Sequence, residues 1–299
     1  MTTRTWVKIA LATLALCVVA LVVAVRTGVL LSLMATPSDW TPEPMADLEV
    51  ECGEAQEPVP WTYCVHRTPG STSRDLLVHF HGRRGTARWW NDTTYYPAEL
   101  YAHWNDSDQA PPTVVSISLG PLWVLTHDTA AAFDEIFAAA HDHAAAWAGH
   151  DFDRTRLVGE SMGGYNALLA GLDGKARFDR VAALCPPLSA RSPFSLAALN
   201  RLQESGAREA FMLLVFSRAF FDDEDDWHHH DPLARILSGE NFEPRLHISC
   251  GLHDPWGCAP GVRAMAEALK AQGNDPDVYL LSDGHCAIDT QALASFLVE

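Results

Sequence analysis

The chain is poor in basic residues. Lys and Arg number 21 against 38 Asp and Glu, which gives a formal net charge of −17 over 299 residues. No basic cluster interrupts this acidic excess, so the sequence lacks the positive patch that nucleic-acid-binding proteins carry. We interpret the acidity mainly as a source of solubility. The composition therefore predicts no nucleic-acid partner.

The sequence also lacks Cys-x-x-Cys spacing and any visible internal repeat. The first absence gives no indication of a zinc site, and the second gives no sign of a repeat architecture. Hydrophobic residues make up 48% of the chain, which supports a substantial core and argues against disorder. The length is sufficient for one large α/β domain with additions.

Charge is missing altogether from Ile9–Val25, an apolar run of 17 residues with Arg4 and Lys8 before it and Arg26 after it. No good small-x-small cleavage site follows directly, which favours an uncleaved signal anchor over a cleaved signal peptide. The basic residues at the start indicate an N-terminus inside and the remainder outside. We predict a membrane-anchored protein with an extracytoplasmic domain, secreted if the segment is cleaved.

Three parts are predicted along the chain: a transmembrane helix in 1–35, a linker in 36–47 that is rich in proline and polar residues, and one α/β domain in 48–299. The expected strands and helices alternate in the third part, which predicts a mostly parallel central sheet with helices on both faces. The strands are expected at Leu48–Cys52, Trp61–Arg67, Leu76–His81, Thr113–Leu119, Arg156–Val158, Arg180–Leu184, Leu246–Cys250 and Val278–Leu281. The helices are expected at Thr129–Trp147, at Gly261–Ala271 and from Thr290.

This alternation stops between residues 186 and 240. The segment has helical runs at Leu196–Leu202 and Glu209–Phe216 but no clear strand, so we interpret it as a small helical cap inserted into the domain. It also contains Asp222–Asp231, where five acidic residues precede Trp227 and three histidines. We expect a solvated acidic loop there, with a divalent-cation site as the less favoured alternative.

One serine lies in a distinctive setting. Ser161 stands in Gly-Glu-Ser-Met-Gly-Gly, after the apolar Leu157-Val158 and before a helical run. This pattern is typical of a nucleophile elbow, in which glycines relieve the clashes of a sharp strand-to-helix turn. The N–H groups at the start of the helix would favour a developing negative charge. An ordinary tight turn that opens a helix is the alternative.

A serine hydroxyl needs a general base, and the base needs an orienting acid. Asp254 and His285 follow the last two predicted strands, in the order Ser, Asp, His that an elbow predicts. We expect Asp254 to orient the imidazole and His285 to act as base and then as acid. The alternatives are a helix-capping aspartate and a surface histidine. His253 is a rival base, although consecutive residues on a tight loop rarely align as partners.

A developing oxyanion also needs hydrogen-bond donors. We expect one from the backbone N–H of Met162, the residue after the nucleophile. The second is expected from the loop His79-Phe80-His81-Gly82-Arg83-Arg84-Gly85, with the N–H of Arg83 as the first choice and that of Arg84 as the next. The alternative is that the two glycines only make a turn.

At this point the chain resembles the α/β-hydrolase superfamily over about residues 48–299. The matching parts are the HFHGRRG loop, the GESMGGYNAL elbow, the GLHD turn and the DGHC turn. The Ser-Met-Gly-Gly-Tyr form is similar to serine esterases of the esterase D and feruloyl-esterase type. The resemblance implies hydrolysis of a small-molecule carboxylic ester through an acyl-enzyme on Ser161, without a metal or organic cofactor. Two arginines stand in the early loop where small residues are usual, and the cap has no pattern that we can assign.

Other functions remain open on the same fold. A serine peptidase or an acyltransferase would use the same three side chains, and a non-catalytic binding protein would need none of them. The presence of all three disfavours the binding protein.

The chain has seven cysteines, and an extracytoplasmic location permits disulfides. We expect Cys52 to pair with Cys64, because the two flank a short link between predicted strands. A bridge between Cys250 and Cys258 would stiffen the loop that carries Asp254. For Cys185 and Cys286 we expect buried thiols as often as a bond, and Cys17 serves as a small apolar residue in the anchor.

Overall fold

The computed structural model of the chain describes residues 6, 13, 16–17, 35–125, 127–174, 177–190, 192–195 and 217–299. The predicted anchor Ile9–Val25 lies outside the described residues, apart from positions 13, 16 and 17. So do the helical runs Leu196–Leu202 and Glu209–Phe216 of the predicted cap. Within the described ranges, no helix combines the length and the apolar character needed to cross a membrane.

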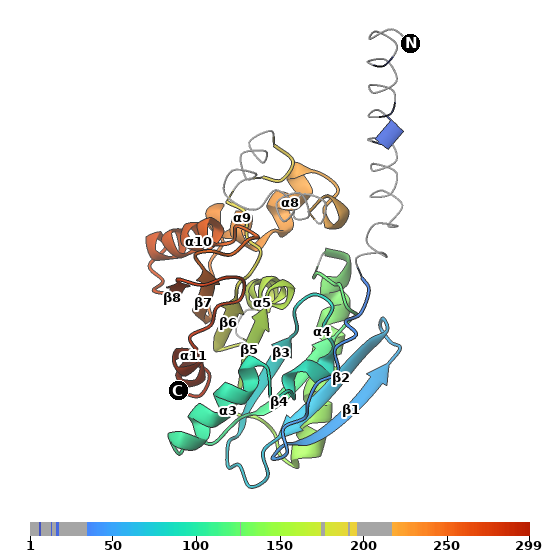
Figure 1. The fold of residues 1–299 in the computed structure, drawn as a ribbon, viewed down its shortest axis with the longest axis vertical. Coiled ribbons are helices and arrows are strands. Elements are labelled where there is room, and N and C mark those ends of the chain that lie inside the picture. The colour runs from blue at the N-terminus through green and yellow to red at the C-terminus, as the bar shows by residue number, and fades with distance from the viewer. Residues whose placement is uncertain are drawn as a thin grey trace.

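An eight-stranded sheet forms the centre of the molecule, in the order β1-β2-β4-β3-β5-β6-β7-β8 (Figure 1). β1 and β2 join at one edge in antiparallel pairing, and every pair from β4 to β8 is parallel. The strands are β1 Glu49–Ala55, β2 Trp61–Arg67, β3 Asp75–Phe80, β4 Thr113–Ser118, β5 Arg154–Glu160, β6 Arg180–Leu184, β7 Arg245–Gly251 and β8 Asp277–Leu281. Parallel strands bring their carboxyl ends to one edge of the sheet, where the loops after β3, β5, β7 and β8 meet.

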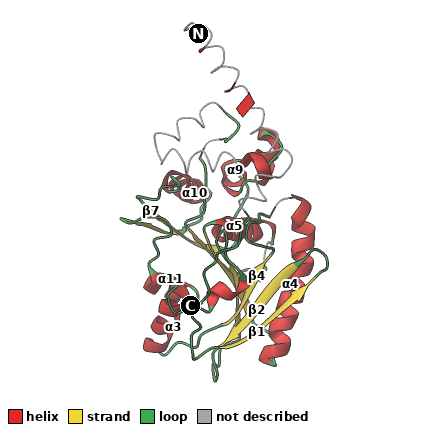
Figure 2. Cartoon of the chain, turned by 45° about the vertical axis from the view of Figure 1, so that its right-hand side comes forward, coloured by secondary structure: helices red, strands yellow, loops and turns green. Residues whose placement is uncertain are grey.

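Helices cover both faces of the sheet (Figures 1 and 2). Successive side chains of a strand point to opposite faces, and the two apolar clusters follow this rule. Leu76, Val78 and Leu157 belong to the larger cluster, whereas Leu77 and Val158 belong to the smaller one. The larger cluster packs under α4 His127–Ala148, α5 Met162–Asp173 and α10 Ala259–Ala271, and the smaller under η1 Ala87–Trp90, α3 Tyr96–Asp106 and α11 Thr290–Phe296. The prediction of a mostly parallel sheet between two helical layers is confirmed.

The predicted strands all occur, β2 and β6 with the predicted bounds and the others with shifted ends, but the helix α3 was not predicted. Its buried residues Leu100 and Trp104, four positions apart, face the sheet, and Pro97 stands in its first turn, where a missing N–H costs nothing. Strand β1 extends to Ala55, beyond the predicted end at Cys52, because it pairs along its whole length with β2.

The insertion between β6 and β7 includes two short helices, α8 Glu224–His230 and α9 Pro232–Leu237. The acidic and histidine run is therefore mainly helical, and the expectation of a loop was wrong. Asp223 caps α8 by accepting the N–H of Asp226 at 2.9 Å, so acidic residues begin the helix and histidines end it. This order suits the helix dipole, which favours negative charge at the start and positive charge at the end.

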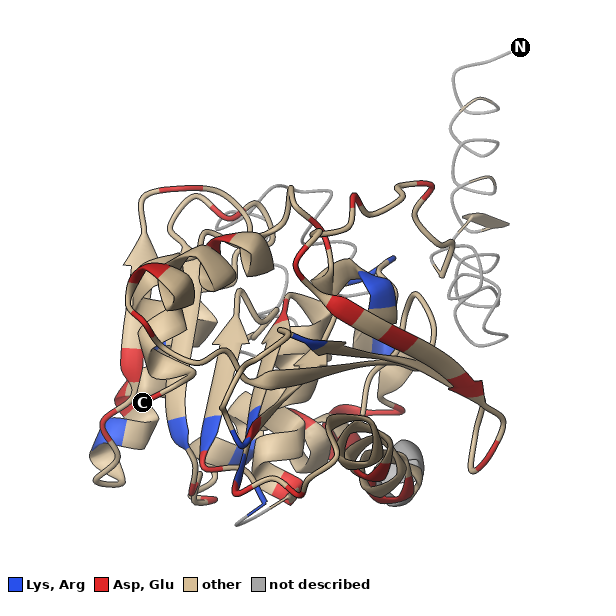
Figure 3. Ribbon diagram, turned by 90° about the horizontal axis from the view of Figure 1, so that it is seen from below, with Lys and Arg blue, Asp and Glu red and all other residues tan. Residues whose placement is uncertain are grey.

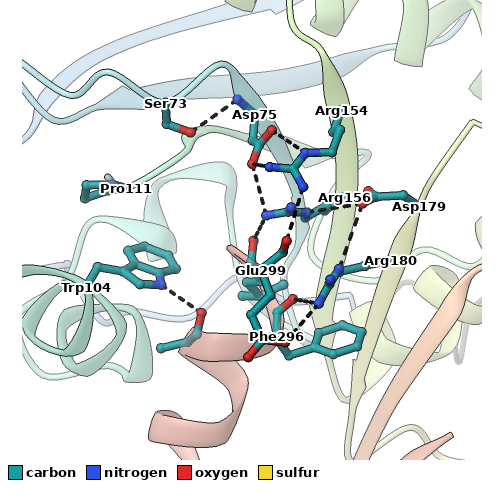
Figure 4. Close-up of polar contacts among 12 residues, drawn as sticks. Ser73, Asp75, Trp104, Pro111, Arg154, Arg156, Asp179, Arg180, Phe296 and Glu299 are labelled. Carbon is teal, nitrogen blue, oxygen red and sulfur yellow. Dashed lines mark hydrogen bonds and ion pairs between the residues drawn. The ribbon is translucent and has the colours of Figure 1, made fainter. Parts of the chain in front are cut away.

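Arginines gather at the amino ends of the strands, opposite to the loops described above (Figures 3 and 4). The fully buried Arg156 donates to the C=O of Leu297 and lies 3.1 Å from Asp75. Asp75 also accepts hydrogen bonds from Nε and Nη2 of Arg154, each at 2.9 Å. Arg180 donates to the C=O of Phe296 at 2.8 Å. This arginine network holds the last turn of α11 against the sheet.

Two disulfides are present in the described part of the chain, Cys52–Cys64 and Cys185–Cys286. The first joins directly paired positions of β1 and β2, which confirms the predicted pair. The second decides between the two alternatives left open for Cys185 and Cys286, because these residues form a bond and are not free thiols. The proposed bridge between Cys250 and Cys258 does not form, and both are buried thiols.

Candidate active site

Ser161 occupies the sharp turn between β5 and α5. Its backbone angles, φ 55° and ψ −116°, lie where L-residues are strained, as a nucleophile elbow requires. The neighbouring glycines allow the backbone segments around this turn to pack closely together. A Cβ on Gly159 would collide with the C=O of Gly163, and a Cβ on Gly163 would collide with the C=O of Phe80. The Ser161 N–H donates to the C=O of Leu184 at 2.8 Å, which ties the turn to β6.

His285 links Ser161 to Asp254. The Ser161 hydroxyl lies 3.0 Å from Nε2 of His285, and Nδ1 of the same ring lies 2.8 Å from Oδ2 of Asp254. With Nδ1–H donating to the carboxylate, Nε2 accepts the serine proton, which is the arrangement of a nucleophile, a base and an orienting acid. Ser161 follows β5, Asp254 follows β7 and His285 follows β8. The parallel sheet therefore brings Ser161 and His285 together although they are 124 residues apart in the chain.

Asp254 is itself held in place. Its side chain is 1% exposed, and Oδ1 accepts the N–H of Trp256 at 2.8 Å. The rival histidine lies elsewhere, since His253 is exposed and its N–H donates to the C=O of Asp283 at 3.0 Å. The structure therefore brings His285, and not His253, to the serine.

The loop after β3 lies against the elbow. A Cβ built on Gly82 would be in ordinary van der Waals contact with Cβ of Ser161, at 3.6 Å, so the two residues lie side by side. The Arg84 N–H donates to the C=O of Pro121 at 2.6 Å, which commits the second-choice oxyanion donor to another partner. Arg83 lines the cleft beside Ser161 and Met162. Met162 is the first residue of α5, where backbone N–H groups have no acceptor within the helix.

Glu160, the residue before Ser161, was not predicted from the sequence. Its side chain is 1% exposed, and Oε1 accepts the N–H of Gly82 at 2.6 Å. Oε2 lies 3.0 Å from Nε2 of His79 and accepts the Tyr96 hydroxyl at 3.3 Å. The burial of Tyr96 and the negative charge of Glu160 raise the pKa of the Tyr96 hydroxyl well above its ordinary value. A charged residue inside an apolar strand-to-helix pattern was the available signal.

An open cleft with about 810 Å³ of empty space, its mouth included, lies over Ser161 and His285. Its walls are largely apolar and come from the loops after β3, β4, β7 and β8, from α5 and from the insertion. The lining side chains include Leu122, Val124, Met162, Phe220, Phe221, Trp227 and Trp256.

A buried polar pair closes one part of this cleft wall. The Tyr165 hydroxyl donates to Oδ2 of Asp231 at 2.8 Å, and Oδ1 of Asp231 caps α9 by accepting the N–H of Ala234 at 2.9 Å. Burial raises the pKa of Asp231 to about 6, although the hydrogen bonds to its carboxylate act in the opposite direction. Asp231 is the one carboxylate of the run Asp222–Asp231 that lines the cleft.

In the described ranges, a single group of side chains has atoms close enough together to hold a metal ion, and it consists of Cys185, His285 and Cys286. The two sulfurs are joined as a disulfide and therefore are not thiolate ligands. The acidic run Asp222–Asp231 does not assemble such a group. Its alternative role as a cation site thus receives no support from the arrangement of these side chains.

Comparisons with known proteins agree with this geometry. Residues 137–286 match the model of the Esterase family, described as "Putative esterase". No curated protein matches the chain. Among solved structures, an esterase of Pyrobaculum calidifontis has 17% identity and a TM-score of 0.63, with 91% of this chain and 89% of that chain covered.

Two further solved structures have the same fold. A brefeldin A esterase, a bacterial homologue of human hormone-sensitive lipase, has 19% identity and a TM-score of 0.62 over 93% of this chain and 85% of its own. A ferulic acid esterase has 13% identity and a TM-score of 0.54 over 83% of this chain and 94% of its own. The family match covers half of the chain, and these structures share its architecture. The chain belongs to the Esterase family and is a carboxylesterase-type hydrolase with the α/β-hydrolase fold.

Proposed function

We propose that the protein hydrolyses carboxylic esters through an acyl-enzyme on Ser161. His285 takes the hydroxyl proton as Ser161 attacks the ester carbonyl, and Asp254 stabilises the resulting imidazolium. The N–H groups of Met162 and Arg83 hold the oxyanion. His285 then gives its proton to the leaving alcohol, and a water molecule releases the acid in a second round of the same steps.

One observation carries this proposal: the continuous contact from the Ser161 hydroxyl through His285 to Asp254, at 3.0 and 2.8 Å, at the floor of the cleft. Both distances are within reach of direct proton transfer. The strained backbone of Ser161 supports the same role, because such strain is typical of functional positions.

The cleft lining supports an ester with an apolar or aromatic group beside the reacting carbonyl. Phe220, Phe221 and Trp227 belong to the insertion between β6 and β7, which we propose acts as a cap over the substrate. The family assignment favours small-molecule esters. A panel of p-nitrophenyl esters of increasing chain length would define the preferred acyl group.

The direct test is the variant Ser161→Ala. We expect a loss of turnover of at least about a thousandfold with the fold unchanged, because no other group can form the acyl-enzyme. The wild type should also be labelled by a fluorophosphonate probe, and the variant should not. Undiminished turnover by the variant, measured with its circular dichroism as a control, would show that Ser161 is not the nucleophile.

We further propose that the catalytic domain is extracytoplasmic and that the N-terminal apolar run anchors it. The 17 uncharged residues with basic flanks support this location, and so do two disulfides, which persist in oxidising compartments. Cell fractionation with an intact-mass measurement tests the proposal. Recovery of the full chain in the soluble cytoplasm would contradict it.

A further inference from the structure

The disulfide Cys185–Cys286 lies at the centre of the site. Cys286 directly follows His285, and Cys185 directly follows the last residue of β6, Leu184. The C=O of Leu184 accepts the N–H of Ser161, and the N–H of Cys185 donates to the C=O of Ser249 at 2.7 Å. The bond thus connects the segment that carries the base to a strand that also holds the nucleophile.

The two halves of the histidine loop are held differently. In its first half, the C=O groups of Leu281 and Asp283 accept N–H groups from the loop that carries Asp254, at 2.7 and 3.0 Å. The second half, residues 285–288, includes a turn at His285 and Cys286 but makes no backbone–backbone hydrogen bond to another loop or strand that the structure describes. His285 itself is exposed. The disulfide therefore provides the covalent link between residues 285–288, which include the imidazole of His285, and the end of β6.

The backbone at both cysteines has a strained conformation that the disulfide helps to maintain. Cys185 and Cys286 have φ angles of 44° and 56°, in the left-handed region that L-residues other than Asn and Asp rarely adopt. Such conformations persist when the surroundings fix them. Without the bond, we expect the turn at Cys286 to relax and to carry the imidazole with it.

We propose that the Cys185–Cys286 disulfide is a positioning device that keeps His285 in line between Ser161 and Asp254, and that ester hydrolysis depends on its oxidised state. The inference rests on the proposed function of the three side chains. A displacement of about 1 Å at a catalytic group can cost a hundredfold in rate. We therefore expect loss of the bond to lower kcat by about ten- to a hundredfold, with KM changed less than about twofold.

The chain provides its own control, because Cys52–Cys64 lies between β1 and β2 at the opposite edge of the sheet from β8. The test uses two double variants, C185A/C286A and C52A/C64A, each assayed before and after treatment with a trialkylphosphine. The phosphine gives two electrons to the remaining disulfide, the sulfurs take up two protons, and phosphorus leaves as its oxide with an oxygen atom from water.

The expected pattern separates the two bonds. C52A/C64A should have the kcat of the wild type and lose it on reduction, with recovery after reoxidation by oxidised glutathione. C185A/C286A should have a low kcat that the phosphine does not change. If kcat of C52A/C64A is unchanged after mass spectrometry has shown complete reduction, the proposal is wrong. A kcat of C52A/C64A that is already as low as that of C185A/C286A before reduction would also overturn it, because loss of either bond would then act through folding.

A second measurement does not depend on turnover. Hydrogen exchange of the peptide 283–289 should become at least about tenfold faster on reduction of C52A/C64A, whereas strand β3 should stay protected. Unchanged exchange of this peptide would overturn the positioning role, even if the protein hydrolysed no ester at all. Failure of the proposed function would instead appear as an absence of fluorophosphonate labelling in the fully oxidised protein.

Discussion

Glu160 shows how much a single side chain contributes to this site. Its carboxylate accepts the N–H of Gly82 from the loop that also carries Arg83, and it stands next to the nucleophile in the chain. A buried carboxylate is costly unless donors surround it, and here His79 and Tyr96 complete the set. We interpret Glu160 as a positioning residue that fixes the distance between the early loop and the elbow.

The variant Glu160→Gln tests this role. The amide keeps the shape of the side chain but removes its negative charge and one of its two acceptor oxygens, which weakens the contacts to Gly82, His79 and Tyr96. We expect kcat to fall by roughly tenfold or more, up to the hundredfold that loss of one oxyanion donor costs, with KM little changed. The matched control is Tyr96→Phe, which removes the 3.3 Å contact alone and should have close to full activity. Equal losses in both variants would indicate a general packing effect.

At the scale of elements, the turn from β5 to α5 is possible because of close backbone approaches. Strand β3 passes so near to α5 that a methyl group on Gly163 would overlap the C=O of Phe80. The glycine before the base is different, because a methyl group on Gly284 would meet no atom within 4 Å. The tight approach is at Gly251 instead, where a side chain would overlap the C=O of Gly284.

These contacts predict opposite outcomes for two similar changes. Gly163→Ala should lower the free energy of unfolding by about 3 kcal/mol, since backbone atoms have no room to move aside. Gly284→Ala should change it by less than about 0.5 kcal/mol. Urea unfolding followed by circular dichroism measures both values. A stable Gly163→Ala protein would mean that the elbow relaxes more easily than the packing indicates.

The elements were predictable where a local pattern determined them. The apolar runs of β3, β4 and β5 and the alanine-rich stripe of α4 indicate their structures directly. The prediction of Ser161, Asp254 and His285 used the same logic, because each follows a strand of the parallel sheet. The pairing of Cys185 with Cys286 was not predictable, since it depends on β6 and the loop after β8 lying side by side. The hydrogen-bond partners of Glu160 were not predictable either, because they come from segments that are distant in the chain.

At the scale of the whole molecule, buried histidines make stability depend on pH. Burial lowers the pKa of His66 to about 3 and the pKa values of His81 and His247 to about 4. Their pKa in the unfolded chain is about 6.5, so between these values the unfolded state binds more protons. Stability is therefore complete above about pH 6.5 and is lost as the pH falls. The raised pKa of Asp231 acts in the opposite direction, but it is one group against three.

We expect the urea midpoint to be lower at pH 5 than at pH 7. Each buried histidine should lower the free energy of unfolding by about 2 kcal/mol between these two pH values. His247 gives the sharpest test, because neither of its ring nitrogens has a hydrogen-bond partner among the described residues. His247→Phe, which retains an aromatic ring beside Tyr279, should reduce the pH dependence by about one third. The exposed His228→Gln should leave it unchanged. Equal slopes in all three proteins would contradict the assignment.

The distance between the arginine network and the cleft has a practical consequence. One group of side chains secures the amino ends of the strands (Figure 4). A different group lines the cleft beyond their carboxyl ends. Substitutions at sites that share no contacts combine almost additively. A library of variants restricted to Leu122, Val124, Phe220 and Trp256 can therefore be screened for altered substrate selectivity. The contribution of the arginine network to the free energy of unfolding should stay the same in these variants.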